Sequence, residues 1–146
     1  MSNTSRGSTN IYGRIQSSFE KSNFLTTIGA VLEFASEGEV QISCKRRDDL
    51  TQQQGFLHGG VVTTIADVTC GYTALTVIPP GMEVLTVEFK INLLRPVTSD
   101  RIVAVGEVVK AGRSLVITEA TVYDETGKAV AKMLSTMIPS PIHDES

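Results

Sequence analysis

The chain has 146 residues, a length that fits a single domain. Hydrophobic residues make up 41% of the chain and charged residues 20%, so disorder along the whole chain is excluded. The formal net charge of −3 provides no general attraction for a polyanion, and nucleic-acid binding is not expected.

Cysteine and histidine are scarce, which limits the possible chemistry. Cys44 and Cys70 form neither a disulfide framework nor a metal cluster, and they favour a reducing compartment, the cytoplasm. With only His58 and His143 in the chain, a histidine metal site is not expected, so no metal is predicted. Aromatic residues make up 5% with no tryptophan, which predicts an aliphatic core.

The ends of the chain are polar. Residues 1–12 are small and polar and predict a flexible tail before a single domain over residues 13–140, with residues 141–146 as a C-terminal tail. The N-terminus lacks the apolar region of a secretory signal. The most apolar segment, residues 56–80, contains Asp67, which would be costly inside a bilayer, so a buried helix rather than a membrane span is expected.

The first predicted elements are short. Residues 11–25 are mildly amphipathic and predict a short helix. Residues 31–35 and 40–44 predict two strands that flank a turn at residues 36–39. A polar connection then leads to the apolar segment.

A long helix is predicted from His58 to Ile78. Apolar residues recur there at spacings of three and four, namely Val61, Ile65, Val68, Tyr72 and Leu75. The other faces carry mostly small or neutral side chains, which is typical of a helix wrapped by other structure.

Four strands are predicted after this helix, over residues 85–93, 102–109, 115–123 and 129–138. In the first of them every odd position is apolar and every even position polar, the period of a strand with one buried face. Short turns make neighbouring strands antiparallel. The predicted fold is therefore α+β, an antiparallel sheet curled around one long helix, and because one helix cannot cover such a sheet, pairing with another chain is expected.

Asp67 is the first candidate for chemistry. It is the only acidic residue between Leu50 and Met82, and burial of an unpaired carboxylate costs several kcal/mol. Such a residue can simply hydrogen-bond to a threonine or to the backbone, but its isolation in an apolar helix favours a functional role. The second candidate is Gly59-Gly60 at the helix start, where exposed N–H groups can polarise a carbonyl oxygen, or where glycine only eases entry into the helix.

The spacing of these two candidates has a geometric consequence. Gly59 and Asp67 are eight residues apart, roughly 12 Å along a helix axis at about 1.5 Å per residue. Both cannot serve one reacting carbonyl from the same helix. If both are catalytic, they come from different chains, at the interface of a homodimer.

Several sequence motifs of this chain resemble those of a known family. The run Gly55-Phe-Leu-His-Gly-Gly-Val-Val-Thr-Thr-Ile-Ala-Asp67 is similar to the G-x-x-H-G-G-x(6)-D signature of hotdog-fold acyl-CoA thioesterases, in the branch of the phenylacetate-pathway thioesterase. Residues 87–96, which end in Arg-Pro, and the turn Val109-Lys-Ala-Gly-Arg-Ser-Leu115 resemble later motifs of that family in the same order. The resemblance covers about residues 28–138.

The resemblance implies roles for five residues. Asp67 would activate the hydrolytic water or attack the thioester directly, while the Gly59 N–H of the opposite subunit would polarise the thioester carbonyl. His58 would support the loop or contact the substrate, or be a purely structural histidine. Gln52 takes the place of an asparagine that helps to position the nucleophile. Thr86 takes the place of a serine or threonine whose hydroxyl can hydrogen-bond to the water or to the acid. A purely structural role is equally open for both residues, with Gln52 as an ordinary loop residue and Thr86 as an ordinary strand residue.

The resemblance also implies binding of coenzyme A, which carries phosphates and is part of the substrate rather than a cofactor. The candidates for this binding are Gly60, Lys90, Arg95, Lys110, Arg113 and Ser114. The expected assembly is a homodimer, or a dimer of such dimers, without a membrane or a nucleic acid as partner.

Two other functions stay open. A non-catalytic protein that binds or senses acyl-CoA could use the same fold, although regulators of this kind tend to lack the helical acid. A hydratase of the same fold would use an Asp-x(4)-His type of pair, and the corresponding position here is Tyr72.

Overall fold

The computed structural model describes residues 3–142. In chain order its elements are α1 (Asn3–Glu20), α2 (Asn23–Ile28), β1 (Ala30–Ser36), β2 (Glu39–Lys45), the short 3-10 helix η1 (Asp48–Leu50), α3 (Gly59–Leu75), β3 (Met82–Leu93), β4 (Arg101–Ala111), β5 (Val116–Asp124) and β6 (Ala129–Pro141). The predicted long helix and all six predicted strands are present.

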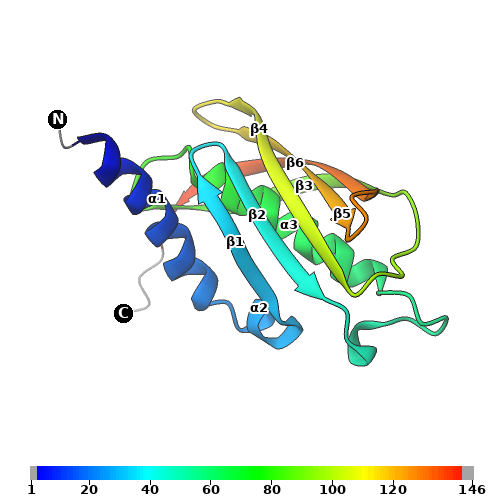
Figure 1. Ribbon diagram of the computed structural model, residues 1–146. Coiled ribbons are helices and arrows are strands. Elements are labelled where there is room, and N and C mark those ends of the chain that lie inside the picture. Colours follow the sequence, from blue (N-terminus) through cyan, green and yellow to red (C-terminus); the bar gives the residue numbers. More distant parts are fainter. Residues whose placement is uncertain (1–2, 143–146) are drawn as a thin grey trace.

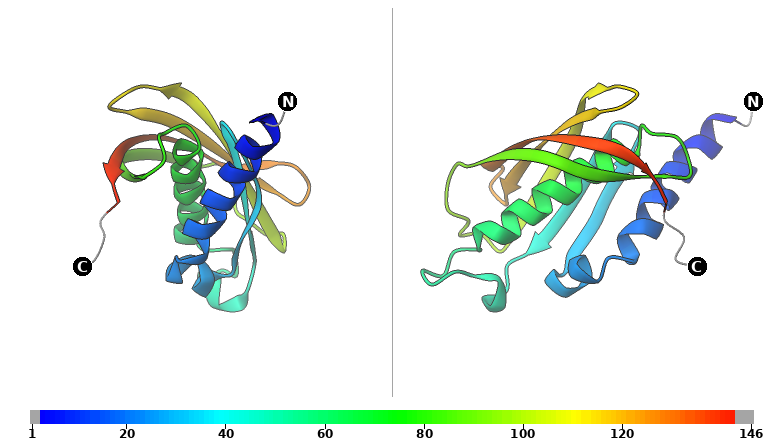
Figure 2. Two further views of the ribbon diagram at one scale, coloured as in Figure 1. Left: turned by 90° about the vertical axis from the view of Figure 1, so that its left-hand side faces the viewer. Right: turned by 180° about the vertical axis from the view of Figure 1, so that it is seen from behind.

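The strands form one antiparallel sheet in the order β1-β2-β4-β5-β6-β3. The sheet curls around α3, as the side view in Figure 2 shows, and α1 lies at the end of the molecule where α3 finishes (Figure 1). The predicted α+β architecture is confirmed. The core between α3 and the sheet is aliphatic, built from residues such as Ile42, Ile65, Ile102, Val122 and Met133.

The face of α3 that packs on the sheet carries mostly small side chains. It carries Val62, Ile65, Ala66, Thr69, Cys70, Thr73 and Ala74, all buried. The predicted stripe is therefore only partly right, since Val61, Val68 and Tyr72 are half-buried at its flank. Small side chains such as Ala66 and Thr69 let the helix axis approach the sheet closely, whereas Val61, Val68 and Tyr72 lie at the edge of the contact.

Gly106 on β4 makes the closest approach possible. A Cβ at this position would lie 3.0 Å from Thr69 Cγ2 and 3.1 Å from Thr69 O, and closer still to Thr73 Oγ1. The two threonine hydroxyls do not remain unpaired in this contact, because each donates to the carbonyl four residues earlier, at 2.7 Å. The glycine on the strand thus sets the depth at which α3 sits in the sheet.

β3 departs from the strict alternation that its sequence predicts. Its register with β6 shifts between Thr86 and Glu88, so Val87 is the extra residue of a β-bulge. Thr86 lies opposite Met137 and Ile91 lies opposite Met133, and both methionines are fully buried. Directly opposed residues share a face, so the bulge brings Thr86 to the inner face of the sheet, together with Ile91.

The first helix is longer than expected. The prediction of a tail over residues 1–12 is corrected, because α1 begins at Asn3. Ile11, Ile15 and Phe19 follow one another at intervals of four, and Ile15 is fully buried, so a helical stripe anchors this segment although its first residues are poor helix formers. At the other end β6 extends to Pro141, and residues 143–146 of the predicted C-terminal tail lie outside the described residues.

Among residues 3–142, no helix has both the length and the apolar character needed to cross a membrane.

Candidate active site

Asp67 lies in the middle of α3, at the wall of a pocket between that helix, β3 and α1. The pocket has a volume of about 190 Å³ and is lined by Ser18, Ser22, Leu25, Asp67, Val68, Gly71, Tyr72, Glu83, Val84 and Thr86. Six of these ten residues carry a polar side-chain group. The carboxyl group is thus half-buried and still accessible from the pocket.

Thr86 is the hydrogen-bond partner of Asp67. Its hydroxyl donates to Asp67 Oδ1 at 3.0 Å and lies 3.2 Å from Met137 Sδ. Burial raises the pKa of Asp67 above the usual aspartate value, and the Thr86 hydrogen bond partly offsets this rise. A carboxyl group with a raised pKa in a pocket is typical of a general base or a nucleophile.

The start of α3 offers one free backbone amide. His58 is the N-cap of the helix, and its Nδ1 accepts a hydrogen bond from the Gly60 N–H at 2.8 Å. The Gly59 N–H has no acceptor among residues 3–142. His58 therefore has a structural role in capping, Gly60 donates its amide to that cap, and Gly59 keeps a donor at the positive end of the helix.

Gln52 closes the loop that precedes α3. Its side-chain oxygen accepts hydrogen bonds from the amides of Gln54 and Phe56, the latter at 3.4 Å. Thr51 and Leu57 form an isolated antiparallel bridge across the same loop. Gln52 thus shapes the approach to Gly59.

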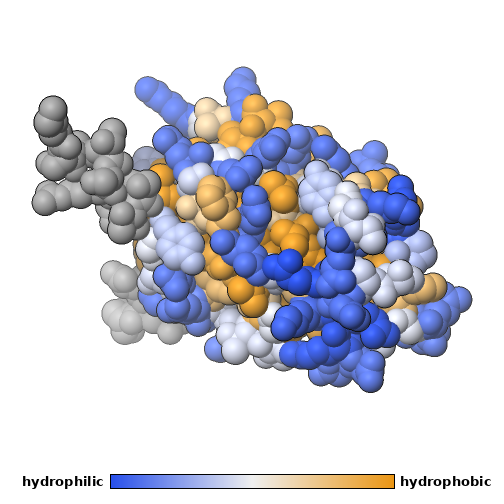
Figure 3. Space-filling model, viewed as in Figure 1, coloured by the Kyte–Doolittle hydropathy of each residue, from blue (hydrophilic) through white to orange (hydrophobic). Residues whose placement is uncertain are grey.

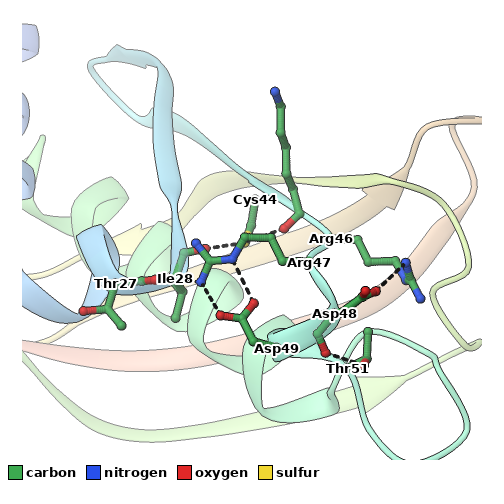
Figure 4. A network of polar contacts seen from close by, with 9 residues as sticks. Thr27, Ile28, Cys44, Arg46, Arg47, Asp48, Asp49 and Thr51 are labelled. Carbon is green, nitrogen blue, oxygen red and sulfur yellow. Dashed lines mark hydrogen bonds and ion pairs between the residues drawn. The ribbon is translucent and has the colours of Figure 1, made fainter.

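A polar network ties the base of this loop to the rest of the fold (Figure 4). The Arg47 guanidinium contacts Asp49 at 3.0 Å and donates to Thr27 O, at the end of α2, at 2.8 Å. Arg46 donates to Gly55 O at 2.8 Å and so crosses the loop itself. Both arginines come directly after β2, so the sheet fixes the position of the helix start.

Gly59 lines a second pocket, separate from that of Asp67, with a volume of about 380 Å³. Gln52, Phe56, Leu93, Leu94 and Arg95 are among the residues around it. The two candidate groups on α3 therefore open into different pockets of one chain. This arrangement agrees with the expectation from helix geometry that Gly59 and Asp67 of one chain cannot serve the same carbonyl.

The predicted coenzyme A-binding residues are not gathered in one place. Arg95 lines the Gly59 pocket, whereas Lys90 lies on β3 opposite Leu134. Lys110 lies near the end of β4, and Arg113 and Ser114 occupy the turn to β5, at the opposite end of the molecule from the start of α3 (Figures 1 and 2). Of the four basic candidates, Arg95 is the one that lines the Gly59 pocket, and Gly60 follows Gly59 directly at the start of α3.

Tyr72 is a pocket residue that the sequence pattern misses, because its place in the apolar stripe predicts a core position. Its hydroxyl is 3.2 Å from Ser18 Oγ on α1, and it lines the Asp67 pocket with Glu83. Cys70, one turn from Asp67, is buried, and burial raises its thiol pKa to about 11. The Cys70 thiol is therefore protonated at neutral pH and is a poor nucleophile.

No group of three or more potential metal ligands occurs within residues 3–142.

A comparison with known protein families identifies the family of this chain. The model of the thioesterase superfamily matches residues 54–131, more than half of the chain, from the loop before α3 into β6. The chain belongs to the thioesterase superfamily. The predicted resemblance to hotdog-fold thioesterases is confirmed, and the prediction of a thioester hydrolase is confirmed at the level of the family.

Similar proteins agree with this family assignment. A putative esterase of Saccharolobus solfataricus is 31% identical over 100 residues, which cover 68% of this chain and 71% of the relative. Human acyl-coenzyme A thioesterase 13 is 30% identical over 115 residues, 77% of this chain and 79% of the relative. A crystal structure of a thioesterase family protein from Silicibacter pomeroyi superposes with a TM-score of 0.86 at 36% identity, over 90% of this chain and 99% of that one.

Proposed function

We propose that this protein hydrolyses acyl-CoA thioesters at a composite site, in which Asp67 of one copy acts with the Gly59 N–H of a second copy. The observation that carries the proposal is the presence of two half-sites on one helix. Asp67 and Gly59 open into separate pockets, and eight residues of helix, about 12 Å, separate them. Human acyl-coenzyme A thioesterase 13, a relative of this chain, supports coenzyme A as the carrier.

The exposed apolar side chains of the edge strand β3 favour the proposed dimer. β3 is the last strand on one side, and it exposes large apolar side chains, with Leu85, Val87 and Leu93 each 56% exposed and Phe89 44% exposed. An exposed apolar edge strand favours pairing with another strand. Addition of β3 from a second copy would extend the sheet across a two-fold axis.

This pairing would also join the two half-sites. Thr86, near the start of β3, lines the Asp67 pocket, whereas Leu93, at its end, lines the Gly59 pocket. In an antiparallel pair of β3 strands, the start of one strand lies beside the end of the other. The Asp67 pocket of one copy would then face the Gly59 pocket of its partner, twice per dimer.

The chemistry follows from the two groups. In one route the ionised Asp67 carboxylate takes a proton from a water molecule, and the water oxygen attacks the thioester carbon. In the other route the carboxylate attacks that carbon itself, and water later releases it. The Gly59 N–H and the positive end of α3 stabilise the negative charge that develops on the carbonyl oxygen. When Asp67 acts as the base, the proton that it took from water passes to the thiolate as the carbon–sulfur bond breaks. When Asp67 attacks directly, the departing thiolate takes a proton from solvent, and water then cleaves the acyl–Asp67 anhydride. Both routes give a free acid and coenzyme A.

The phosphates of coenzyme A need positive charge at the entrance. Arg95 lines the Gly59 pocket and is the first candidate. In the dimer, Lys90, Lys110, Arg113 and Ser114 of the other copy are further candidates. The outer face of the sheet carries apolar patches between charged side chains (Figure 3), and a second dimer could pack there.

The function is tested by incubating the purified protein with acyl-CoAs of different length and aromaticity. The expected result is release of free coenzyme A, detected with a thiol reagent, without added metal or cofactor. Tight binding of acyl-CoA with no release would contradict the proposal and favour a non-catalytic binding protein. Addition of water to an enoyl-CoA would instead identify a hydratase.

Replacement of Thr86 with Val is expected to move the acid limb of the pH profile of kcat/KM to higher pH. The Thr86 hydrogen bond lowers the pKa of Asp67, so its loss leaves only the raising effect of burial. Because the ionised carboxylate is the reactive form, activity is lost as the pH falls through this pKa, and the loss then begins at higher pH. Thr86→Ser keeps the hydroxyl and should retain the wild-type limb. An unchanged limb in Thr86→Val would refute the coupling.

A further inference from the structure

Helix α1 contributes to the wall of the Asp67 pocket. Ser18 on α1 and Tyr72 on α3 face each other there, with their hydroxyl oxygens 3.2 Å apart. The neighbouring Phe19 contacts the Tyr72 ring, with centroids 6.0 Å apart and planes inclined by 50°. Consecutive residues of α1 thus hold both the ring and the hydroxyl of Tyr72.

Arg14 fixes α1 in this position. Its guanidinium donates four hydrogen bonds to backbone carbonyls, to Leu75 O at 3.2 Å, Ile78 O at 3.0 Å, Pro79 O at 2.9 Å and Met82 O at 3.0 Å. These carbonyls belong to the last residue of α3, the following loop and the first residue of β3. Ser18 follows Arg14 by one helical turn, so this clamp holds Ser18 against α3.

A larger pocket adjoins the Asp67 pocket on this side. Its volume is about 710 Å³, and its lining includes Ile11, Ser17, Leu75, Met82 and Glu83. Ser18 and Glu83 line both this cavity and the Asp67 pocket. The two spaces are therefore neighbours, and Ser18 and Glu83 lie on their shared boundary.

We propose that the Ser18–Tyr72 pair determines acyl-chain length. It closes the Asp67 pocket so that the enzyme accepts short acyl groups, and its removal connects the pocket to the adjoining cavity. The inference rests on the proposed function, because it takes the pocket of about 190 Å³ beside the catalytic carboxylate as the acyl site. This volume is below the roughly 300–1,000 Å³ typical of pockets that enclose drug-sized ligands.

The test compares kcat/KM for butanoyl-, octanoyl- and dodecanoyl-CoA in wild type, Tyr72→Ala and Ser18→Gly. In the wild type we expect the value for dodecanoyl-CoA to be at least about tenfold below that for butanoyl-CoA, because a chain that cannot enter the pocket loses its binding. Tyr72→Ala should remove most of this difference, and Ser18→Gly should reduce it. Ser17→Gly is the matched control, since Ser17 lines only the larger cavity and carries the same helix penalty.

Binding of non-hydrolysable S-alkyl-CoA thioethers, measured by calorimetry, gives the same comparison without hydrolysis. If no acyl-CoA is hydrolysed, the proposed function fails, while the thioether series still decides the length preference. A flat chain-length profile in the wild type would overturn the inference, as would wild-type profiles in both variants. If Tyr72→Ala does not fold, judged by circular dichroism, Ser18→Gly decides alone.

Discussion

Replacement of Asp67 with Asn is expected to lower kcat by about 100-fold or more, in the range of a lost general base. Asn has nearly the same shape as Asp and can still accept the Thr86 hydrogen bond through its amide oxygen. It cannot take a proton from water or attack a thioester. The loss should therefore fall on the chemical step, with little change in the binding of acyl-CoA.

The same variant should not be less stable than the wild type. Burial raises the pKa of Asp67 in the folded state, so its contribution to stability is present below the unfolded pKa and is lost as the pH rises through the folded pKa. At neutral pH the ionised side chain thus opposes folding, and a neutral amide removes that cost. Thermal unfolding at pH 7 should show an equal or higher Tm. Asp100→Asn, an exposed acid outside both pockets, is the control and should keep full activity. Full activity in Asp67→Asn would exclude Asp67 as base or nucleophile.

Replacement of Gly59 with Pro is expected to lower kcat by about 100- to 1,000-fold, the range for loss of one oxyanion donor. Gly59 is the first residue of α3, where proline fits because its missing N–H is not needed within the helix. The preceding residue, His58, already has φ −61° and ψ 135°, a conformation compatible with a following proline. The substitution therefore removes the amide donor while the helix is retained.

Gly59→Ala is the matched control. It keeps the N–H and adds only a Cβ, which would lie 3.1 Å from Leu93 Cδ1, the end of a flexible side chain. Most of the wild-type kcat should therefore remain, measured as coenzyme A release. Equal losses in the two variants would show that bulk at position 59, and not the amide, causes the effect.

The sequence predicts the parts of this protein that depend on local spacing. The turn residues and apolar runs locate α3 and all six strands, because each signal lies within a few neighbouring residues. The separation of Gly59 and Asp67 is also local, since helix geometry alone fixes it. The two separate pockets agree with the expectation that one chain holds two half-sites.

The features that the sequence misses depend on contacts between distant segments. The bulge at Val87 brings Thr86 to the inner face, although the alternation in β3 predicts the opposite side. Tyr72 is an apolar-stripe residue by spacing, and only the position of α1 brings it beside Ser18. α1 itself carries many residues with weak helix propensity, so its length depends on burial of Ile15 and on the Arg14 clamp.

The central claim, a site shared between two copies, is tested most directly by mixing Asp67→Asn with Gly59→Pro. Each variant alone should be nearly inactive. After joint unfolding and refolding, a heterodimer would combine Asp67 of the Gly59→Pro chain with the Gly59 N–H of the Asp67→Asn chain in one of its two sites. Random pairing should then restore about a quarter of the wild-type activity. If the mixture forms heterodimers, verified with two different tags, and remains as inactive as its parents, Asp67 and Gly59 do not act across the interface.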